Sequence, residues 1–386
     1  MVQFREYETA FWLRMKKTMG IAIKCCVSIR KNFHLKMTMN IRNDLHGLTI
    51  FRFVTAFYVF LFHCNIRYKA DVSDWLQSVI NNGAIGMSFF FVLSGFVMAW
   101  ASRNGIKENY YRSRIARIFP AYLAMGLITA PFLFEYNITQ ITTYILLFLT
   151  TAQSWFPDSF SQWNFGGSWS VSTEMFFYLV FPFLLPVIKK RPVLALSIAV
   201  LISSIIIPTS MILTNSAAFP RYYVSPIHRL PEFVAGVAIG CIFTQGFRFT
   251  RFNTSLFILA IASLLFISPE NNNSWMQNNY VTLPATCIVV YYLASAAINK
   301  SKLTLPLIYL GKISYSFYLM QLPIMIYITK YHDSLASLPT WLIWTLLAAI
   351  NLMMASACYH FVEDNKTIKS LILNWRRKPN SSLELS

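Results

Sequence analysis

The sequence predicts an all-α, polytopic membrane protein with about ten transmembrane helices and a short re-entrant or interfacial helix near 139–155. Two observations predict this class. Hydrophobic residues make up 56% of the 386 residues and charged residues only 12%, which is too apolar for a soluble protein of this length. Apolar runs of about 20 residues, the length that a helix needs to cross a bilayer, recur along the chain. We therefore expect any chemistry to lie within the membrane bundle.

Apolar runs with polar flanks predict spans at 47–67, 85–101, 118–135, 169–188, 192–213, 230–245, 253–268, 279–298, 306–330 and 340–361. An inside N-terminus places most of the 33 Lys and Arg residues in cytoplasmic stretches. Outward-facing basic residues are then only Arg67, Lys69, Arg221 and Lys330. We expect both termini to be cytoplasmic in a multi-pass protein of the inner (cytoplasmic) membrane. The net charge of +18 is therefore a topology signal, and no nucleic-acid partner is predicted.

The run 139–155 has two interpretations. An eleventh span there would place Lys189, Lys190 and Arg191 outside and invert everything after it. We therefore interpret the run as a short re-entrant or interfacial helix that enters and leaves on the outer side. The alternative is a full span with a local violation of the charge rule.

The predicted domains are a basic cytoplasmic extension at 1–42, a membrane domain at 43–362 and a short basic cytoplasmic tail at 363–386. The first 36 residues lack the uninterrupted apolar region and the cleavage site of a secretory signal. Because Met37 and Met39 precede the first span, we interpret residues 1–36 as an extension from a misassigned start codon. The six cysteines show no metal-ligand spacing, and most lie in apolar runs. Neither a metal site nor a disulfide framework is predicted.

The first span contains two ionisable residues, Arg52 and His63. Eleven residues correspond to about three helical turns, so both side chains share one face about 16 Å apart. Ionisable groups within a membrane are costly and usually functional. The structural alternatives are a packing histidine bonded to a backbone carbonyl and an interfacial arginine that extends toward the headgroups.

Glu174 lies within the fourth predicted span, where a carboxylate needs a partner. In the predicted topology Glu174 and His63 both lie in the outer half of the bilayer and can meet. The alternatives are that Glu174 pairs with Arg229 or contacts a substrate. Glu232, three residues after Arg229, is predicted to pair with that arginine. The small residues Ser94 and Gly95 in the second predicted span are predicted to permit close packing of two helices.

Six stretches occur in the order of successive motifs in a known family: RFVTAFYVFLFH (52–63), GMSFFFVLSGFVMAW (86–100), RSRIARIFPAYL (112–123), GSWSVSTEMFFYLVFPFL (167–184), RLPEFVAGVAIG (229–240) and GKISYSFYLMQLPI (311–324). In these motifs the chain, from about residue 43 to 365, resembles the membrane acyltransferase-3 family. The resemblance implies an enzyme that moves an acyl group, most often acetyl, from acyl-coenzyme A to a hydroxyl of a bacterial surface glycan. The implied acceptor is a glycan or lipid-linked glycan, such as lipopolysaccharide O-antigen or exopolysaccharide. Acyl-coenzyme A would be a substrate, and no permanently bound cofactor is expected.

The resemblance also implies catalytic roles. His63 matches the family's catalytic histidine and would act as general base or as transient acyl carrier. Arg52 and Glu174 are the other implied catalytic residues. A Glu174 carboxylate bonded to the imidazole would hold its tautomer and stabilise the imidazolium. Direct transfer and a short-lived acyl-enzyme both stay open.

Arg114 and Arg117 match the family's site for the nucleotide end of acyl-coenzyme A, and Tyr122 follows them closely. Two arginines three residues apart on a helical turn can converge on phosphate groups. We place them in the cytoplasmic loop before the third span. The alternative is that both arginines serve only as the positive-inside signal.

The implied substrate-binding residues are Trp169, Ser172, Ser314 and Tyr315. Trp169 would line an acceptor entrance, although an interfacial tryptophan belt explains it equally well. The chain departs from many relatives at Gln321, where they carry histidine. Glutamine forms hydrogen bonds but cannot titrate, which puts a second acid/base role at this position in doubt.

Two other classes of function compete with acyl transfer. A secondary transporter or flippase also uses intramembrane Arg, His and Glu, but the chain shows no internal repeat. A non-catalytic scaffold would leave the buried charges without a role. P-loop, HExxH and GxSxG motifs are absent, so ATP-driven export, zinc hydrolysis and serine-esterase chemistry lack sequence support. The sequence does not predict an oligomeric state.

Overall fold

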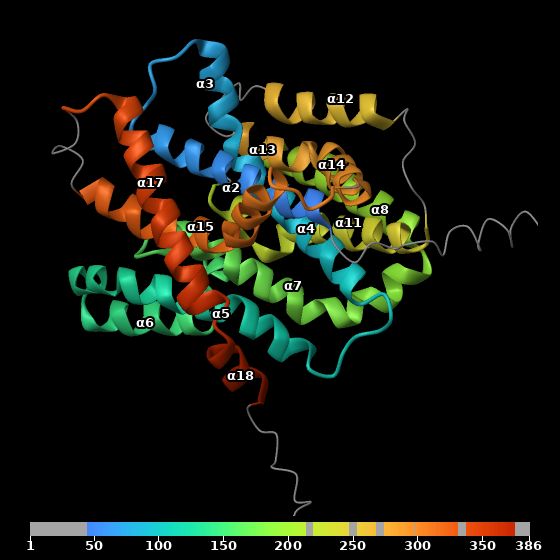
Figure 1. Cartoon of the computed structure of the whole chain (residues 1–386), viewed down its shortest axis with the longest axis horizontal. Helices are drawn as coiled ribbons and strands as arrows, with labels where there is room; N and C mark the ends of the chain where they lie inside the picture. The colour runs from blue at the N-terminus through green and yellow to red at the C-terminus, as the bar shows by residue number, and fades with distance from the viewer. Residues whose placement is uncertain are drawn as a thin grey trace, which may run out of the picture. The chain divides into compact units, whose positions relative to one another are not determined.

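A computed structural model describes residues 45–213, 219–246, 253–267, 274–296, 298–330 and 337–374. These ranges contain helices and no β-strand. The α-helices are α2 His46–Arg67, α3 Asp74–Asn81, α4 Gly86–Ala101, α5 Tyr110–Thr129, α6 Ile138–Leu149, α7 Phe165–Lys190, α8 Pro192–Leu201, α9 Ile207–Leu213, α10 Arg221–Val224, α11 Pro226–Thr244, α12 Asn253–Phe266, α13 Ser274–Val281, α14 Leu283–Ser295, α15 Thr304–Lys330, α17 Thr340–Cys358 and α18 Lys366–Asn374 (Figure 1). Short 3-10 turns are η1 Asn82–Ile85, η2 Ala130–Glu135, η3 Gln153–Trp155 and η4 Pro157–Ser159, and π-helical turns are η5 Ile202–Ile206 and η6 Tyr359–Glu363.

The helices confirm the predicted all-α membrane fold. Among the described residues, seven helical stretches are long and apolar enough to cross a membrane, and they coincide with seven predicted spans. The 27-residue α15 contains the predicted span 306–330, and the shorter apolar helices α12 and α14 occupy the remaining two. The predicted extension at 1–42 lies outside the described residues. The described helices belong to a unit that begins at His46.

The third span begins earlier than predicted. Helix α5 starts at Tyr110, so Arg114 and Arg117 lie on its first turns and not in a loop before it. The Tyr110 hydroxyl donates to the Tyr178 carbonyl of α7 at 3.0 Å, and its ring stacks on Phe181 at 5.8 Å. Hydropathy places a boundary at the first charged residue, whereas arginine and alanine favour continuation of the helix. This extension fixes both arginines on a rigid element.

The run after α5 forms a short helix, as predicted. Helix α6 has 12 residues, so its length is about 18 Å, too short for a bilayer core of about 30 Å. A reciprocal cap between Asn137 and Gln140 begins it. Its Phe148 stacks on Tyr122 of α5 with ring centroids 4.1 Å apart. This short helix agrees with the favoured interpretation of the run, and Figure 1 shows α6 alongside α5.

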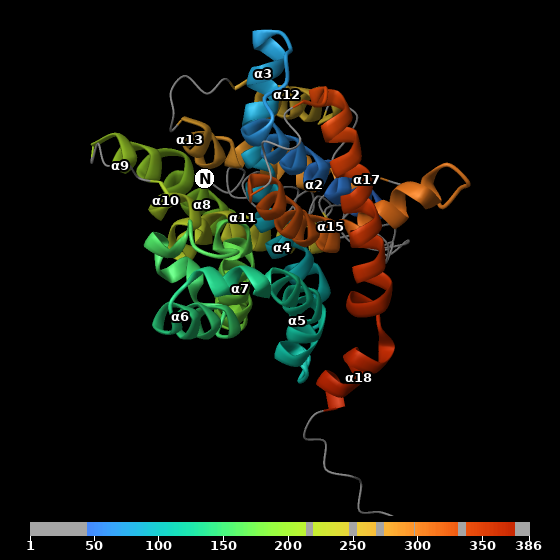
Figure 2. The same ribbon diagram turned by 90° about the vertical axis from the view of Figure 1, so that its left-hand side faces the viewer.

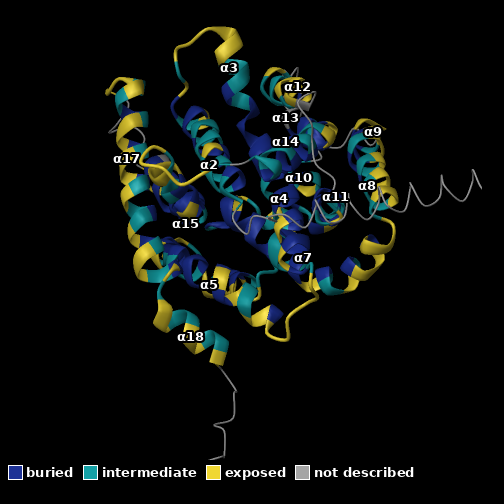
Figure 3. Ribbon diagram, turned by 45° about the vertical axis from the view of Figure 1, so that its right-hand side comes forward, coloured by how far each residue is buried: buried dark blue, intermediate teal, exposed yellow. Residues whose placement is uncertain are grey.

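Helices α4 and α11 form the centre of the bundle. In the most apolar part of the candidate span Asp74–Ala101, which contains α4, 83% of the residues are buried. The corresponding share is 28% for the span that contains α17, whose outer side is exposed (Figure 3). A Cβ atom at Gly95 of α4 would collide with the Phe233 carbonyl oxygen, and one at Gly236 of α11 would collide with that of Val92. The two backbones are therefore in direct contact, a packing that small residues permit in membranes. Figure 2 shows α4 and α11 adjacent.

Helix α2 packs against α15 through aromatic rings. Phe317 of α15 contacts Phe53 and Phe60 of α2 edge-on, at centroid distances of 5.2 and 5.6 Å. Edge-to-face contacts of this kind stabilise packing beyond the area that they bury. The contact sets Tyr318, the next residue of α15, beside the cavities that Arg52 and His63 line, and Gln321, about one turn after Phe317, against His63.

Candidate functional site

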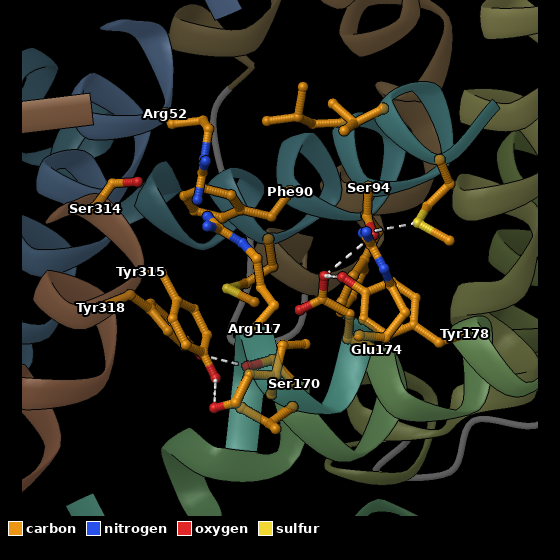
Figure 4. Close-up of a pocket in the computed structure, with 18 residues that line it drawn as sticks. Arg52, Phe90, Ser94, Arg117, Ser170, Glu174, Tyr178, Ser314, Tyr315 and Tyr318 are labelled. Atoms are coloured by element: carbon orange, nitrogen blue, oxygen red, sulfur yellow. Dashed lines mark hydrogen bonds between the residues drawn. The ribbon is translucent and has the colours of Figure 1, made fainter. Parts of the chain in front are cut away.

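Two cavities lie along α2. The arginine cavity has a volume of about 140 Å³, and its polar lining is Arg52, Ser94, Arg114, Arg117, Ser170, Glu174, Tyr178, Ser314, Tyr315 and Tyr318 (Figure 4). The histidine cavity has a volume of about 630 Å³ and is lined by His63, Arg67, Glu135, Trp163, Asn164, Trp169, Tyr223, Tyr318, Lys330 and further apolar residues. Arg52 and His63 therefore line different cavities, and these cavities lie near opposite ends of α2.

Glu174 belongs to the arginine cavity. Its carboxylate accepts hydrogen bonds from Ser94 of α4, at 3.1 Å, and from Tyr178 one helical turn further along α7 (Figure 4). The structure thus assigns Ser94 to a polar contact, while the neighbouring Gly95 provides the close helix packing. Sequence reasoning missed Tyr178, although its spacing of four residues from Glu174 was a readable signal. Glu174 and His63 line separate cavities, and the predicted contact between them is not seen.

Arg114 lines the arginine cavity, and its guanidinium group has a hydrogen-bond donor that is not used. Its guanidinium donates to the weak acceptor Met98 Sδ at 3.3 Å and lies 5.8 Å from the ring centre of Tyr178. Its Nε is buried and has no hydrogen-bond partner within the described chain. Buried donors are normally satisfied in native proteins, so an unsatisfied one that lines a cavity suits an anionic ligand.

Arg117 has a protein partner that the sequence analysis did not identify. Its Nη1 lies 3.7 Å from Glu363 Oε1, with the arginine side chain 43% exposed and the glutamate 1% exposed. The other Glu363 oxygen accepts a 2.6 Å hydrogen bond from Ser316 of α15. Glu363 is the last residue of the π-helical turn η6, whereas the sequence analysis assigned it to the C-terminal tail. The family motifs around Arg117 gave no hint of a partner 246 positions away.

In the histidine cavity, the amide of Gln321 contacts the catalytic candidate His63. Gln321 Oε1 lies 3.2 Å from His63 Nδ1, and Gln321 Nε2 donates to the Tyr318 carbonyl at 2.9 Å. The lining also includes Lys330 of α15 and Glu135 of η2, which form an ion pair. Neither of these charged residues was singled out from the sequence as functional. The cavity thus combines a histidine with aromatic and polar walls.

The two cavities share two lining residues, Met87 of α4 and Tyr318 of α15. The Tyr318 hydroxyl donates to the Gly167 carbonyl at 3.0 Å, which leaves its oxygen to accept from Ser170 at 2.9 Å (Figure 4). Tyr318 is therefore held by both of its hydrogen bonds. We call these two shared side chains the partition. Because methionine is unbranched and adaptable, the partition consists of one fixed side chain, Tyr318, and one flexible side chain, Met87.

The structure distributes the other predicted site residues unevenly. Ser314 and Tyr315 line the arginine cavity, where the Tyr315 hydroxyl donates to the Ile118 carbonyl at 3.1 Å. Trp169 lines the histidine cavity. Tyr122 lines neither cavity, because its buried hydroxyl donates to the Phe148 carbonyl and accepts from Gln153. Ser172 likewise lines neither and accepts a 2.6 Å hydrogen bond from Ser154.

The predicted pair between Arg229 and Glu232 is confirmed. The two charged groups are fully buried and 3.2 Å apart. Four aromatic rings lie 5.2 to 5.9 Å from the guanidinium carbon, namely those of Phe91, Trp169, Tyr223 and Tyr280. Ser88 donates to the Glu232 carboxylate at 2.7 Å. The pair belongs to the packed interior behind Trp169, so the alternative pairing of Arg229 with Glu174 is not formed.

Comparison with known proteins adds independent information. The sequence profile of a family described as an acyltransferase domain matches residues 45–360. Acyltransferase MdmB of Streptomyces mycarofaciens is 30% identical over 225 residues, which cover 52% of this chain and 58% of MdmB. O-acetyltransferase OatA of Staphylococcus aureus is 24% identical over 364 residues, which cover 83% of this chain and 56% of OatA. A regulator of hypoxia-inducible factor 1 from Caenorhabditis elegans is 25% identical over 221 residues, which cover 48% of this chain and 43% of that protein.

The matched region includes every cavity-lining residue named above, and Glu363, the partner of Arg117, stands just beyond its end. The chain spans little more than half the length of MdmB and OatA. No solved structure matches it. Because the profile covers most of the chain and all of the motifs, this multi-pass membrane protein belongs to the acyltransferase 3 family.

Proposed function

We propose that the protein is an O-acyltransferase that moves an acyl group, most commonly acetyl, from acyl-coenzyme A to a hydroxyl of a surface glycan. One observation carries the proposal: an arginine-lined cavity and a histidine-lined cavity meet at a single partition of Met87 and Tyr318. Such an arrangement suits a reaction between two substrates that arrive separately. Family membership favours acyl transfer over the transporter hypothesis.

The arginine cavity suits an anionic donor. Arg52, Arg114 and Arg117 come from two helices and line one small volume. Guanidinium groups bind phosphate oxygens through paired hydrogen bonds, and a coenzyme A nucleotide carries several phosphates. The cavity volume of about 140 Å³ is smaller than a nucleotide requires, which suits the thin pantetheine arm, with the phosphates at the arginines of α5 and the thioester nearest the partition.

The histidine cavity suits the acceptor. Aromatic faces such as those of Trp163 and Trp169, together with polar groups such as Asn164, are the chemistry that packs against and hydrogen-bonds a sugar ring. His63 would remove the hydroxyl proton as the oxygen attacks the thioester carbonyl carbon. The carbon–sulfur bond then breaks, and the imidazolium returns the proton to the departing thiolate. The products are an O-acyl ester and free coenzyme A. A transient acyl-histidine gives the same products in two steps.

The charge distribution supports an orientation for this reaction. By the positive-inside rule, the basic residues around α5 favour a cytoplasmic position for the arginine cavity, on the side where acyl-coenzyme A occurs, and an outer position for the His63 end of α2. An exported or lipid-linked glycan would then reach His63 from outside. We propose a bacterial inner membrane with both termini cytoplasmic.

Purified protein in liposomes tests the proposal. Acetyl-coenzyme A labelled in the acetyl group is supplied together with a lipid-linked glycan, and the products are examined by mass spectrometry. We expect one acetyl mass on the glycan and an equal amount of free coenzyme A. Release of free acetate without glycan modification, or movement of unmodified glycan across the membrane, would replace acyl transfer by hydrolysis or transport.

A further inference from the structure

We propose that Gln321 is a positioning residue that holds His63 in the tautomer with the proton on Nδ1, so that Nε2 is the base. This inference deepens the proposed function and rests on it. It concerns the position at which the sequence departs from the histidine of many relatives. The assignment follows from the hydrogen bonds that surround the Gln321 amide.

The orientation of the Gln321 amide is determined by a backbone carbonyl. The Gln321 side chain is fully buried, and its nitrogen donates to the Tyr318 carbonyl oxygen at 2.9 Å. A carbonyl oxygen can only accept, so the amide nitrogen must occupy this position. Gln321 Oε1 is consequently the atom that faces His63 Nδ1 at 3.2 Å.

This orientation determines which imidazole nitrogen carries the proton. An amide oxygen accepts but cannot donate, so the contact is a hydrogen bond only when Nδ1 is protonated. In a neutral imidazole the other nitrogen is then the acceptor. A group bonded to one nitrogen of a catalytic histidine sets its tautomer, a role usually played by a carboxylate or a backbone carbonyl. Glu174, predicted for this role, lies in the other cavity, and Gln321 occupies the position instead.

The charged groups around His63 come from three elements. Arg67, one turn further along α2, donates to the His63 backbone carbonyl at 3.3 Å. Glu135 of η2 and Lys330 of α15 line the same cavity as an ion pair. Tyr318 and Tyr223 contribute ionisable hydroxyls to its lining. The hydrogen bond to the imidazole ring itself comes from the neutral amide, so replacing this amide by an acid changes the charge directly at the ring.

The test uses full-length protein in liposomes with acetyl-coenzyme A and a glycan acceptor. Variant Gln321→Leu removes the acceptor, and Gln321→Glu replaces the amide by a carboxylate of the same shape. The matched control is Asn351→Leu, because Asn351 is a buried amide of α17 that also donates to a backbone carbonyl of α15, that of Phe317 at 3.1 Å. Rates are measured from pH 5 to 9, with kcat and the KM of each substrate.

We expect Gln321→Leu to lower kcat by about 10- to 100-fold with little change in either KM, as for other groups that orient a histidine. In Gln321→Glu the carboxylate would stabilise the imidazolium and move the acid limb of the pH–rate profile up by about one pH unit or more. Asn351→Leu should reproduce the wild-type profile.

A Gln321→Glu enzyme that is active with an unshifted acid limb overturns the inference, even if Gln321→Leu fails to fold. An equal fall in kcat for Gln321→Leu and Asn351→Leu also overturns it, because the loss of any buried amide would then be sufficient. Absence of acyl transfer by the wild-type protein is a different outcome, since that result counts against the proposed function itself.

Discussion

Replacement of Arg117 by alanine should destabilise the protein, because it leaves the Glu363 carboxylate buried without its counter-charge. Removing one member of a fully buried ion pair costs about 3–5 kcal/mol. Here the Arg117 side chain is 43% exposed and its nearest nitrogen is 3.7 Å from the carboxylate, so we expect about 2 kcal/mol. Glu363→Gln keeps the contact with Ser316 and removes the charge, so its cost should stay below about 1 kcal/mol.

The double variant of these two positions discriminates between explanations. If the cost arises from the stranded charge, Arg117→Ala combined with Glu363→Gln should be more stable than Arg117→Ala alone by about 1 kcal/mol or more. Denaturant unfolding in detergent, followed by tryptophan fluorescence, measures all four proteins of the cycle. A double variant whose destabilisation equals the sum of the single ones would refute the reasoning. Donor affinity should therefore be tested for Arg117→Ala in the Glu363→Gln background.

Three further predictions concern the reaction. His63→Ala should lower kcat by about 10²- to 10⁴-fold with unchanged unfolding, and full glycan modification by a stably expressed variant would exclude His63 as the base. Met87→Ala should raise the preference for butyryl over acetyl donors by about tenfold or more, whereas Met325→Ala, within the histidine cavity alone, should leave this ratio unchanged. In intact cells, Ser161→Cys in the lining of the histidine cavity should react with an impermeant thiol reagent, whereas Arg114→Cys in the arginine cavity should not; the reverse pattern would show an inverted topology.

The sequence was sufficient for the helices because a membrane span depends on local composition. Ten apolar runs predicted ten helical segments, and the eleven-residue spacing of Arg52 and His63 correctly placed both on one helix. The start of α5 was misplaced because hydropathy registers charge, whereas the helix continues through arginines that line a cavity. Local sequence patterns therefore predict the presence of helices more accurately than the residues at which the helices begin and end.

The site was less accessible to sequence reasoning, since its contacts join distant segments. The pair between Arg229 and Glu232 was predictable because both lie on one helical turn. The partners of Arg117 and His63, Glu363 and Gln321, lie hundreds of positions away and depend on how α15 and η6 pack. Gln321 was noted only as a departure from relatives, and its meaning required the hydrogen bond to Tyr318.

The partition of Met87 and Tyr318 also has an electrical consequence in the proposed orientation. If water fills each cavity from its own side, most of the membrane voltage falls across these two side chains, at about 2.3 kcal/mol per elementary charge per 100 mV. In the proposed reaction the phosphates of the donor would stay with the arginines, and only a neutral thioester would reach the partition. The acyl group would therefore cross the steepest part of the field without carrying charge, and the proposed transfer would neither consume nor dissipate the membrane potential.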